Sequence, residues 1–395
     1  MIPPGKLPDV GTTVFTVMSR RAAETGAINL GQGFPDYPCD PLLGELVATA
    51  MAEGHLQYAP MAGVMLLRER IAAELGARHG IAIDPEQEVT ITAGATEGLY
   101  STIQALVGPG EEAIVFDPSY DSYDPAVRLA GARCVHIPLE PPRFRTDWAR
   151  VAAAINERTR LVIINTPQNP ACTCLAAADF DELARLLRGR DCRVLADEVY
   201  ERIVFDGAAH ASVLAHPELR VRSVAVYSFG KTLHATGLRV GYAVGPALLT
   251  AELRKVHQFN TFAINTPMQH ALAAWLAARP GFGGELAAFF AARRDLLMQS
   301  LAGSGWRALR PAGSYFLLAD YAALGDEDDV ALAGRLVDEA GVATIPLSVF
   351  YLEPPAGMRL LRLCFAKREQ TLVEGARRLS AWGQSQGARG AGSTQ

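Results

Sequence analysis

Short apolar segments alternate with amphipathic ones from about residue 88 to residue 244. Amphipathic spacing at 149–156 and 177–187 predicts helices. The apolar segments are rich in Val and Ile and show little polar alternation, which is typical of strands covered on both faces. They span residues 88–93, 113–116, 134–137, 161–165, 193–196, 223–227 and 240–244. This alternation predicts an α/β domain with a mostly parallel, seven-stranded sheet.

The pattern changes after Pro267. Longer amphipathic segments predict helices and short apolar segments predict strands, which favours a second, smaller α+β domain. The helices span 268–278, 286–302, 330–340 and 369–382, and the strands span 315–319, 342–345 and 360–364. The last residues are rich in Gly, Ser and Gln, so we expect a disordered tail. The expected parts are an N-terminal arm that joins the small domain (1–40), a large domain (41–285), a small domain (286–383) and the tail (384–395).

Composition argues against several classes of protein. The net charge of −5 and the scattered basic residues argue against nucleic acid as the main partner. The apolar segments are short and interrupted by Gly, Pro or charge, so we expect no membrane span and no membrane partner. The first ten residues hold three prolines and no long apolar run, unlike a secretory signal. We therefore expect a cytoplasmic protein.

The six cysteines are widely spaced along the chain. Cys172 and Cys174 form the only close pair, and neither a second pair nor a histidine cluster accompanies them at the spacing of a zinc site. This spacing favours free thiols in a reducing compartment, and we expect no metal.

The segment 228–241 carries one lysine, Lys231, among small residues, eight positions ahead of Arg239. A lysine amine can form a Schiff base with the aldehyde of pyridoxal phosphate, and an arginine suits the phosphate. Asp197 ends an apolar segment, where a carboxylate is poorly solvated and needs a cationic partner. A pyridinium N–H would supply one, and an N-cap or a salt bridge within the protein would also satisfy Asp197.

Residues 92–98 follow the first predicted strand and open a helix. Their small side chains would let backbone N–H groups approach a phosphate at the helix N-terminus. By itself this motif fits a tight strand–helix turn equally well. Asn169 and Tyr200 can donate hydrogen bonds to the ring oxygen of the same cofactor, and Tyr120 could stack on its ring, although ordinary partial burial also explains a loop tyrosine.

Arg362 lies within an apolar segment that predicts a strand. A buried arginine without a carboxylate partner is costly. Either an acidic residue of the protein pairs with it, or a substrate carboxylate does. Two-point recognition of an amino-acid carboxylate is the functional interpretation.

The order and spacing of these residues resemble the class I aminotransferases, which are pyridoxal-phosphate enzymes of fold type I. The resemblance is strongest to the group that holds methionine aminotransferase and kynurenine aminotransferase / glutamine transaminase K. It covers about residues 15–382, and its most specific segments are 29–36, 165–170, 197–201, 228–241 and 345–350. One segment departs from the family pattern, because Ala171–Cys174 stands where many relatives have Thr-Gly or Leu-Gly.

The resemblance implies a role for each site residue. Lys231 would be the Schiff-base lysine, with Asp197 on the pyridine nitrogen and Tyr200 on the ring oxygen as the other catalytic residues. The remaining cofactor-binding residues would be Ala95, Thr96, Tyr120, Asn165, Asn169, Ser228, Arg239 and, across a subunit boundary, Tyr58. The substrate-binding residues would be Phe15, Gly33, Asn169, Arg362 and, from the partner chain, Phe262.

The resemblance also implies the reaction and the partners. A homodimer would transfer the amino group of an apolar, sulfur-containing or aromatic L-amino acid, methionine-like above all, to a 2-oxo acid, with pyridoxamine phosphate as the intermediate cofactor form. A β-lyase that cleaves cysteine S-conjugates would use the same cofactor and the same first proton loss. A noncatalytic sensor of amino acids is the alternative from another class, and it accounts poorly for a chain that keeps Lys231, Asp197 and Arg362.

Overall fold

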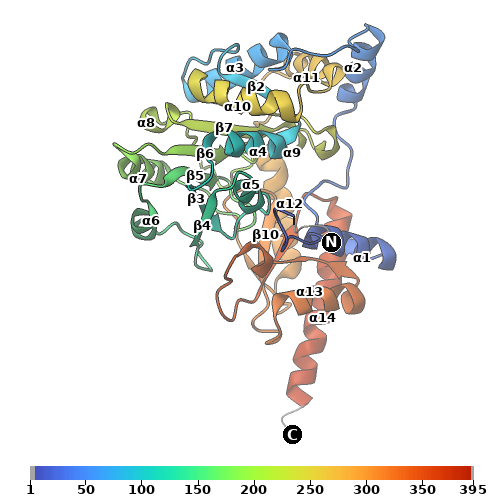
Figure 1. The fold of residues 1–395 in the computed structure, drawn as a ribbon. Coiled ribbons are helices and arrows are strands. Elements are labelled where there is room, and N and C mark those ends of the chain that lie inside the picture. The colour runs from blue at the N-terminus through green and yellow to red at the C-terminus, as the bar shows by residue number, and fades with distance from the viewer. Residues whose placement is uncertain (1–4, 393–395) are drawn as a thin grey trace.

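The structure, a computed structural model, describes residues 5–392 (Figure 1). A seven-stranded sheet with the strand order β2-β8-β7-β6-β5-β3-β4 forms its centre. Neighbouring strands are parallel except β8, which is antiparallel to both β2 and β7. The predicted α/β fold with a mostly parallel sheet is therefore confirmed. The strands are β2 (Val89–Thr92), β3 (Glu112–Asp117), β4 (Arg133–Pro138), β5 (Thr159–Asn165), β6 (Arg193–Asp197), β7 (Ser223–Ser228) and β8 (Gly241–Val244).

Helices cover both faces of this sheet, which explains why its strands are apolar throughout. Successive residues of a strand point to opposite faces, and in β5 both sets are buried. Leu161 and Ile163 join the core beneath α4 (Gly94–Leu106), α5 (Tyr123–Leu129) and α10 (Ala247–Asn260). Val162 and Ile164 join the core on the other face, which is covered by α3 (Met65–His79), α6 (Trp148–Ala154), α7 (Ala177–Leu187), α8 (Pro217–Arg220) and α11 (Thr266–Ala278).

A separate, smaller sheet of four antiparallel strands has the order β12-β13-β10-β9. Its strands are β9 (Arg307–Leu309), β10 (Phe316–Asp320), β12 (Ile345–Pro346) and β13 (Leu360–Cys364). It shares a core with α12 (Leu286–Leu301), α13 (Asp329–Arg335) and α14 (Glu369–Gly392). Near the N-terminus, Met18 and Ala22 of α1 (Val14–Thr25) join this core, and β1 (Ile28–Asn29) pairs in parallel with β11 (Val342–Ala343). The expected domain boundaries themselves stay a prediction.

The C-terminal segment differs from its expectation. A disordered tail was expected from residue 384, but α14 continues to Gly392. Residues 383–392 contain no proline, and each residue added to an existing helix gains a backbone hydrogen bond without a new nucleation cost. Composition alone could not show that a helix already formed upstream would extend into this segment. Residues 393–395 of the expected tail lie outside the described residues.

Several helices were not among the sequence predictions, notably α1, α2 (Pro41–Ala52), α3 and α10. In α2 nearly every residue is apolar or small, so its sequence lacks the contrast between faces that identifies an amphipathic helix. No helix in the described part of the chain is both long and apolar enough to cross a membrane.

Candidate active site

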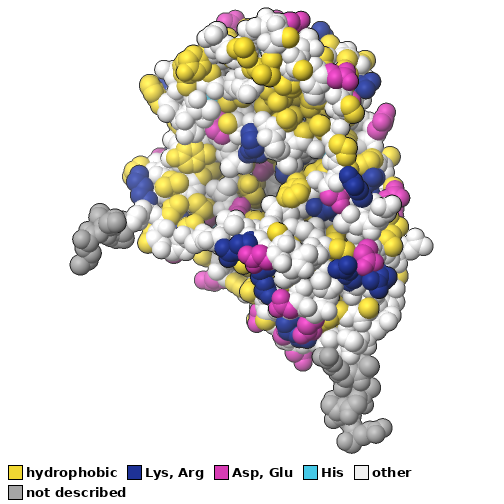
Figure 2. Space-filling model, turned by 90° about the vertical axis from the view of Figure 1, so that its right-hand side faces the viewer, with side chains coloured by type: hydrophobic (Ala, Val, Ile, Leu, Met, Phe, Trp, Pro, Cys, Tyr) yellow, Lys and Arg dark blue, Asp and Glu magenta, His cyan; other side chains and the backbone are white. Residues whose placement is uncertain are grey.

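One cavity brings together all the predicted site residues except Tyr58 and Phe262. It lies at the carboxyl ends of β5, β6 and β7, where ligands bind in open α/β sheets, and β13 and α1 supply the other wall. Figure 2 shows one face of the molecule hollowed between an upper part and a lower part. The lining residues are Phe15, Gln32, Gly33, Ala95, Thr96, Leu99, Tyr120, Asp121, Asn165, Asn169, Asp197, Val199, Tyr200, Ser228, Lys231, Arg239, Phe316 and Arg362.

Lys231 reaches the cavity from α9 (Phe229–Thr232), a single turn that begins where β7 ends. Its Nζ lies 5.8 Å from the centroid of the Tyr200 ring and 5.7 Å from that of Tyr315. Burial disfavours the charged amine and lowers the pKa of Lys231 to about 8. A larger share of this amine is therefore neutral near physiological pH, as a nucleophile or a general base requires.

Asp197 is the last residue of β6 and is almost fully buried. Its carboxylate accepts a hydrogen bond from the Tyr123 hydroxyl at 2.7 Å and one from the Val199 amide at 3.3 Å. Burial raises the pKa of Asp197 to about 6, against the lowering effect of those two hydrogen bonds. No ion pair to Asp197 is found in the described residues, so the alternative of a salt bridge within the protein is not supported.

A chain of hydrogen bonds joins Asp197 to Arg362 through two asparagines. Asn165, at the end of β5, donates from Nδ2 to the Asp197 carbonyl at 2.8 Å. Its Oδ1 accepts the Asn169 amide at 2.7 Å, and the Asn169 Oδ1 in turn accepts a hydrogen bond from Arg362 Nη1 at 2.7 Å. The two asparagines therefore fix the spacing between the acidic end and the basic end of the cavity.

Arg362 is 1% exposed and lies in the middle of β13. Its Nη2 donates to the Gly31 carbonyl at 2.9 Å, and its guanidinium lies 3.9 Å from the centroid of the Phe316 ring. Its Nε has no hydrogen-bond partner, and no carboxylate in the described part of the chain pairs with it. Of the two partners that the sequence allowed, a protein acid is absent from the described residues, and the ligand carboxylate stays a prediction.

An anion-binding pocket occupies the opposite end of the cavity. The backbone N–H groups at the start of α4, where Ala95 and Thr96 lie, have no side-chain cap. Gly94 has a φ of +75°, and a Cβ there would lie 2.7 Å from Nη2 of Arg239. Ser228 lines the same cavity. Uncapped N–H groups, a hydroxyl and a guanidinium packed against a glycine form a donor set that fits a phosphate.

Aromatic side chains pack around Asp197: the Tyr123 hydroxyl donates to its carboxylate, and Tyr120 and Tyr200 line the same cavity. The Tyr120 and Tyr123 rings meet edge to face at 5.7 Å, and Tyr200 packs edge to face on Tyr315 at 5.0 Å. Burial raises the pKa of Tyr200 well above its ordinary value, so its hydroxyl stays a donor. Tyr123, Tyr315 and Phe316 escaped sequence reasoning because only tertiary packing carries them to the site, although Tyr123 lies one turn from Tyr120.

Tyr58 and Phe262 lie outside the cavity and contact each other edge to face at 5.4 Å. Tyr58 is 85% exposed, and Phe262 is 47% exposed. Within a single chain, neither residue contributes to the site. Their predicted role across a subunit boundary stays a prediction.

Comparison with known proteins identifies the family. The family model for aminotransferases of class I and II matches residues 25–379. The chain belongs to this family. It is 52% identical over 379 residues to methionine aminotransferase of Escherichia coli (strain K12), which covers 96% of this chain and 98% of that protein. It is 30% identical over 410 residues to kynurenine–oxoglutarate transaminase 1 of Mus musculus, which covers 95% and 97%.

A solved structure supports the assignment of this chain to the aminotransferase family. A crystal structure from Escherichia coli, reported to have a methionine aminotransferase function, matches with a TM-score of 0.94 and 51% identity. The match covers 96% of this chain and 100% of that chain. The predicted fold and enzyme class are therefore confirmed, and the noncatalytic sensor is rejected.

The raised pKa of Asp197 predicts a stability difference that depends on pH. In the cofactor-free aminotransferase, folded Asp197 keeps its proton to a pH of about 6, whereas the unfolded chain releases it near pH ~4. The stability that this proton contributes is complete below that lower value and is lost as the pH rises through about 6. Relative to Asp197→Asn, which does not titrate, the wild-type free energy of unfolding should fall by roughly 3 kcal/mol across this window. Urea unfolding at several pH values measures the difference, and a constant difference would contradict the assigned pKa.

Proposed function

We propose that this aminotransferase holds pyridoxal phosphate and transfers the amino group of a sulfur-containing or other apolar L-amino acid, with methionine favoured, to a 2-oxo acid. The observation that carries the proposal is the combination in one cavity of three buried groups: a lysine with a lowered pKa, an acid with a raised pKa and an arginine without an acidic partner. Each of these groups is costly in an empty cavity and is satisfied by the cofactor or by the substrate.

The residues present fit the proposed cofactor. Lys231 would hold its aldehyde carbon covalently, and Asp197 would pair with its ring nitrogen. The ring oxygen would accept hydrogen bonds from Tyr200 and Asn169, with Tyr120 stacked on the ring and Asn165 beside it. The donors for the phosphate would be Ala95, Thr96, Ser228 and Arg239, together with Tyr58 of a second subunit. When bound, the cofactor supplies an electron sink for the charge left at the substrate Cα after proton loss.

Three side chains would each have a separate role in the reaction. Lys231 Nζ would take the Cα proton of the substrate as general base and return it as general acid. Arg362 binds the substrate carboxylate through donors that it does not use within the protein, Nε among them. Asp197 would stabilise a positive charge on the ring nitrogen of the bound cofactor. With the carboxylate fixed, the Cα–H bond is held in one orientation relative to Lys231.

The charges that line the cavity support an apolar substrate side chain. Its cations are Lys231, Arg239 and Arg362, and the mechanism uses all three. No further cation lines the cavity in the described residues, so a second substrate carboxylate would have no partner. Phe15 and Phe316 flank Arg362 instead, with ring centroids 5.1 Å and 3.9 Å from its guanidinium carbon. Gly33 lies against the same wall, where a Cβ would come within 2.7 Å of Phe316.

A panel of amino acids tested with several 2-oxo acids separates this proposal from the β-lyase alternative. Methionine, leucine, phenylalanine and kynurenine should act as donors, and aspartate should be poor because the described residues that line the cavity offer no cation for its side chain. A cysteine S-conjugate that yields pyruvate and a thiol without any oxo-acid acceptor would identify β-lyase activity.

The described cysteines are all free, which supports a reducing compartment and hence a location in the cytoplasm.

We also propose that the enzyme is a homodimer with composite active sites. Large apolar side chains are exposed on α10 and in the segment after α2: Leu56 59%, Tyr58 85%, Leu248 83% and Phe259 86%. Figure 2 shows hydrophobic side chains gathered over the upper part of the molecule, where Figure 1 has α2, α3, α10 and α11. An apolar patch of this kind favours burial against a second copy. Tyr58 and Phe262 belong to it, so dimerisation would bring both residues near the partner's cavity.

Lys231→Ala tests the covalent role of the lysine. The wild-type enzyme should be yellow and should yield a stable adduct on Lys231 after borohydride reduction, detected by mass spectrometry. The variant should lose the adduct and nearly all turnover, because no other lysine among the described lining residues can replace Nζ. Lys6→Ala, at an exposed position outside α10 and the cavity, is the control and should behave as wild type. Normal transaminase rates in Lys231→Ala would refute the assignment.

Arg362→Lys tests the carboxylate site. Lysine keeps the charge but loses the planar fork, so kcat/KM for methionine should fall about ten- to a hundredfold, the equivalent of ~1.5–3 kcal/mol. The absorbance of the bound cofactor should barely change, and amines without a carboxylate should be poor substrates of the wild type. Arg359→Lys, outside the cavity, is the matched control. If kcat/KM is unchanged in folded Arg362→Lys, the carboxylate is bound elsewhere.

Phe259→Glu tests the dimer. A charge in the middle of a buried apolar interface is costly, so the variant should sediment as a monomer and lose activity together with the residues donated by the partner. Val221→Glu, at a 69% exposed site beside α8, is the control and should leave the dimer intact. A wild-type enzyme that is fully active as a monomer would exclude composite sites.

A further inference from the structure

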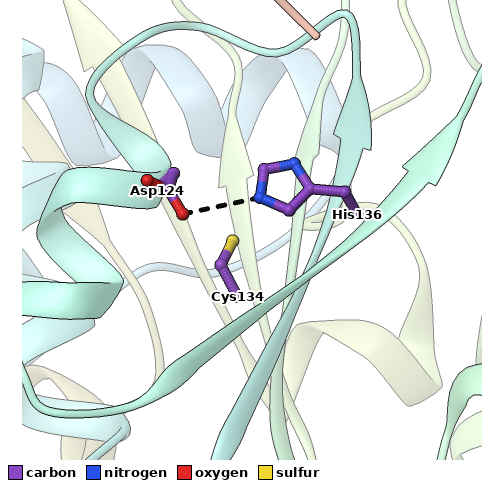
Figure 3. Close-up of side chains that lie close together, drawn as sticks. All are labelled: Asp124, Cys134 and His136. Carbon is purple, nitrogen blue, oxygen red and sulfur yellow. Dashed lines mark hydrogen bonds and ion pairs between the residues drawn. The ribbon is translucent and has the colours of Figure 1, made fainter. Parts of the chain in front are cut away.

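A cluster of metal-ligating side chains lies at the edge of the seven-stranded sheet, outside the cavity of Lys231. Cys134 and His136 are two residues apart on the edge strand β4, so they project from the same face. Asp124 comes from the first turn of α5. One ligand atom of each residue lies within 4.8 Å of the others. Figure 3 shows the Asp124 carboxylate, the Cys134 sulfur and the His136 ring facing a common point.

The orientation of His136 is the second observation that favours a metal. Its Nδ1 lies 2.9 Å and 3.0 Å from the two oxygens of Asp117, so this nitrogen donates its hydrogen to that carboxylate. Asp117 is buried and is itself held by the Leu352 amide at 2.8 Å. Nε2 points the other way and lies 3.5 Å from Asp124 Oδ1. A histidine that ligates zinc through one nitrogen commonly donates the other to a carboxylate in this manner.

We propose that Asp124, Cys134 and His136 bind one zinc ion, with Asp117 as the carboxylate that orients His136. A thiolate, an imidazole and a carboxylate are the three ligand types that zinc takes in proteins, and water would complete a tetrahedral site. No motif in the sequence indicates this site, because Cys134 has no cysteine partner at a metal-binding spacing and Asp124 is ten residues away.

A proton is the competing occupant of the cluster. Burial opposes a charge on His136, but hydrogen bonds to Asp117 and Asp124 raise its pKa to about 12. Burial also raises the pKa of the Cys134 thiol. Zinc must therefore displace a proton from each of these two ligands. Arg128, which also faces the cluster, donates to Asp124 Oδ2 at 3.2 Å and leaves Oδ1 toward His136.

The zinc ion would tie β4 to the first turn of α5. That turn begins at Tyr123, whose hydroxyl donates to the carboxylate of Asp197. The metal would thus brace the helix that carries a hydrogen-bond donor to the active-site acid, without contact to substrate or cofactor. We expect a structural role, visible as a higher Tm with zinc than without it.

Measurements of zinc and cobalt binding to the wild-type holoenzyme test the proposal. After removal of adventitious metal by chelator and dialysis, elemental analysis should find one zinc per chain at saturation. Cobalt should bind at the same stoichiometry and add a sulfur-to-cobalt charge-transfer absorption in the difference spectrum, which zinc then abolishes. Binding of less than one ion per chain, or cobalt binding without the sulfur band, overturns the proposal and leaves His136 as a protonated bridge between two carboxylates.

Three variants locate the site. Cys134→Ser should lose the sulfur band and at least tenfold in zinc affinity, whereas Cys39→Ser, also a partly exposed free cysteine, should keep both. Asp117→Asn keeps all three ligands, so the band should remain while affinity falls about 10- to 100-fold. A sulfur band that persists in Cys134→Ser places the metal elsewhere. Because the wild-type measurement stands alone, a variant that fails to fold does not affect the test.

Discussion

Two charges of opposite sign are buried in one cavity without pairing with each other, and the geometry of the site depends on how they are held apart. Asp197 accepts hydrogen bonds from Tyr123 and a backbone amide, and Arg362 donates to Asn169 and a backbone carbonyl. Asn165 connects the two ends. A buried charge is tolerated when it is hydrogen-bonded and strongly destabilising when it is left unpaired. Both side chains keep unused capacity toward the cavity, so a ligand that carries a cation at one end and a carboxylate at the other satisfies both.

The strand order accounts for the convergence of the first half of the site. Parallel strands end at the same edge of a sheet, and β5, β6 and β7 are adjacent, so Asn165, Asp197 and Ser228 emerge side by side. The antiparallel strand β8 starts at that edge with Gly241, where a Cβ would lie 2.7 Å from the Ala95 amide. Close packing of glycine against the start of α4 keeps the anion-binding amides at the end of the cavity.

The second half of the site depends on the smaller sheet and on the N-terminal segment. Arg362 pairs in register with Leu318 of β10 and with Ile345 of β12, in the interior of that sheet. Gly31 accepts its hydrogen bond, and Phe15 of α1 packs near its guanidinium. Arg362 belongs to the smaller sheet, and Lys231 follows β7 of the larger one. A movement of one sheet relative to the other would therefore change the distance from Arg362 to Lys231.

The sequence by itself determined the strands of the large sheet, because strands buried on both faces need uninterrupted apolar residues, and it determined the residues at their ends. Asp197 and Arg362 stood out because charged groups are costly within such segments or at their ends. Lys231 stood out as the one lysine among small residues ahead of Arg239, and Asn169 as a hydrogen-bond donor for the ring oxygen of the cofactor. The sequence could not determine α2, which lacks a polar face, or the end of α14, which follows from the helix upstream of it. Only tertiary structure decided that Tyr123 reaches Asp197, that no acid among residues 5–392 reaches Arg362, and that Asp124 meets Cys134 and His136. Each of these contacts joins segments that have no local pattern in common, so their chemistry exists only after packing has brought them together.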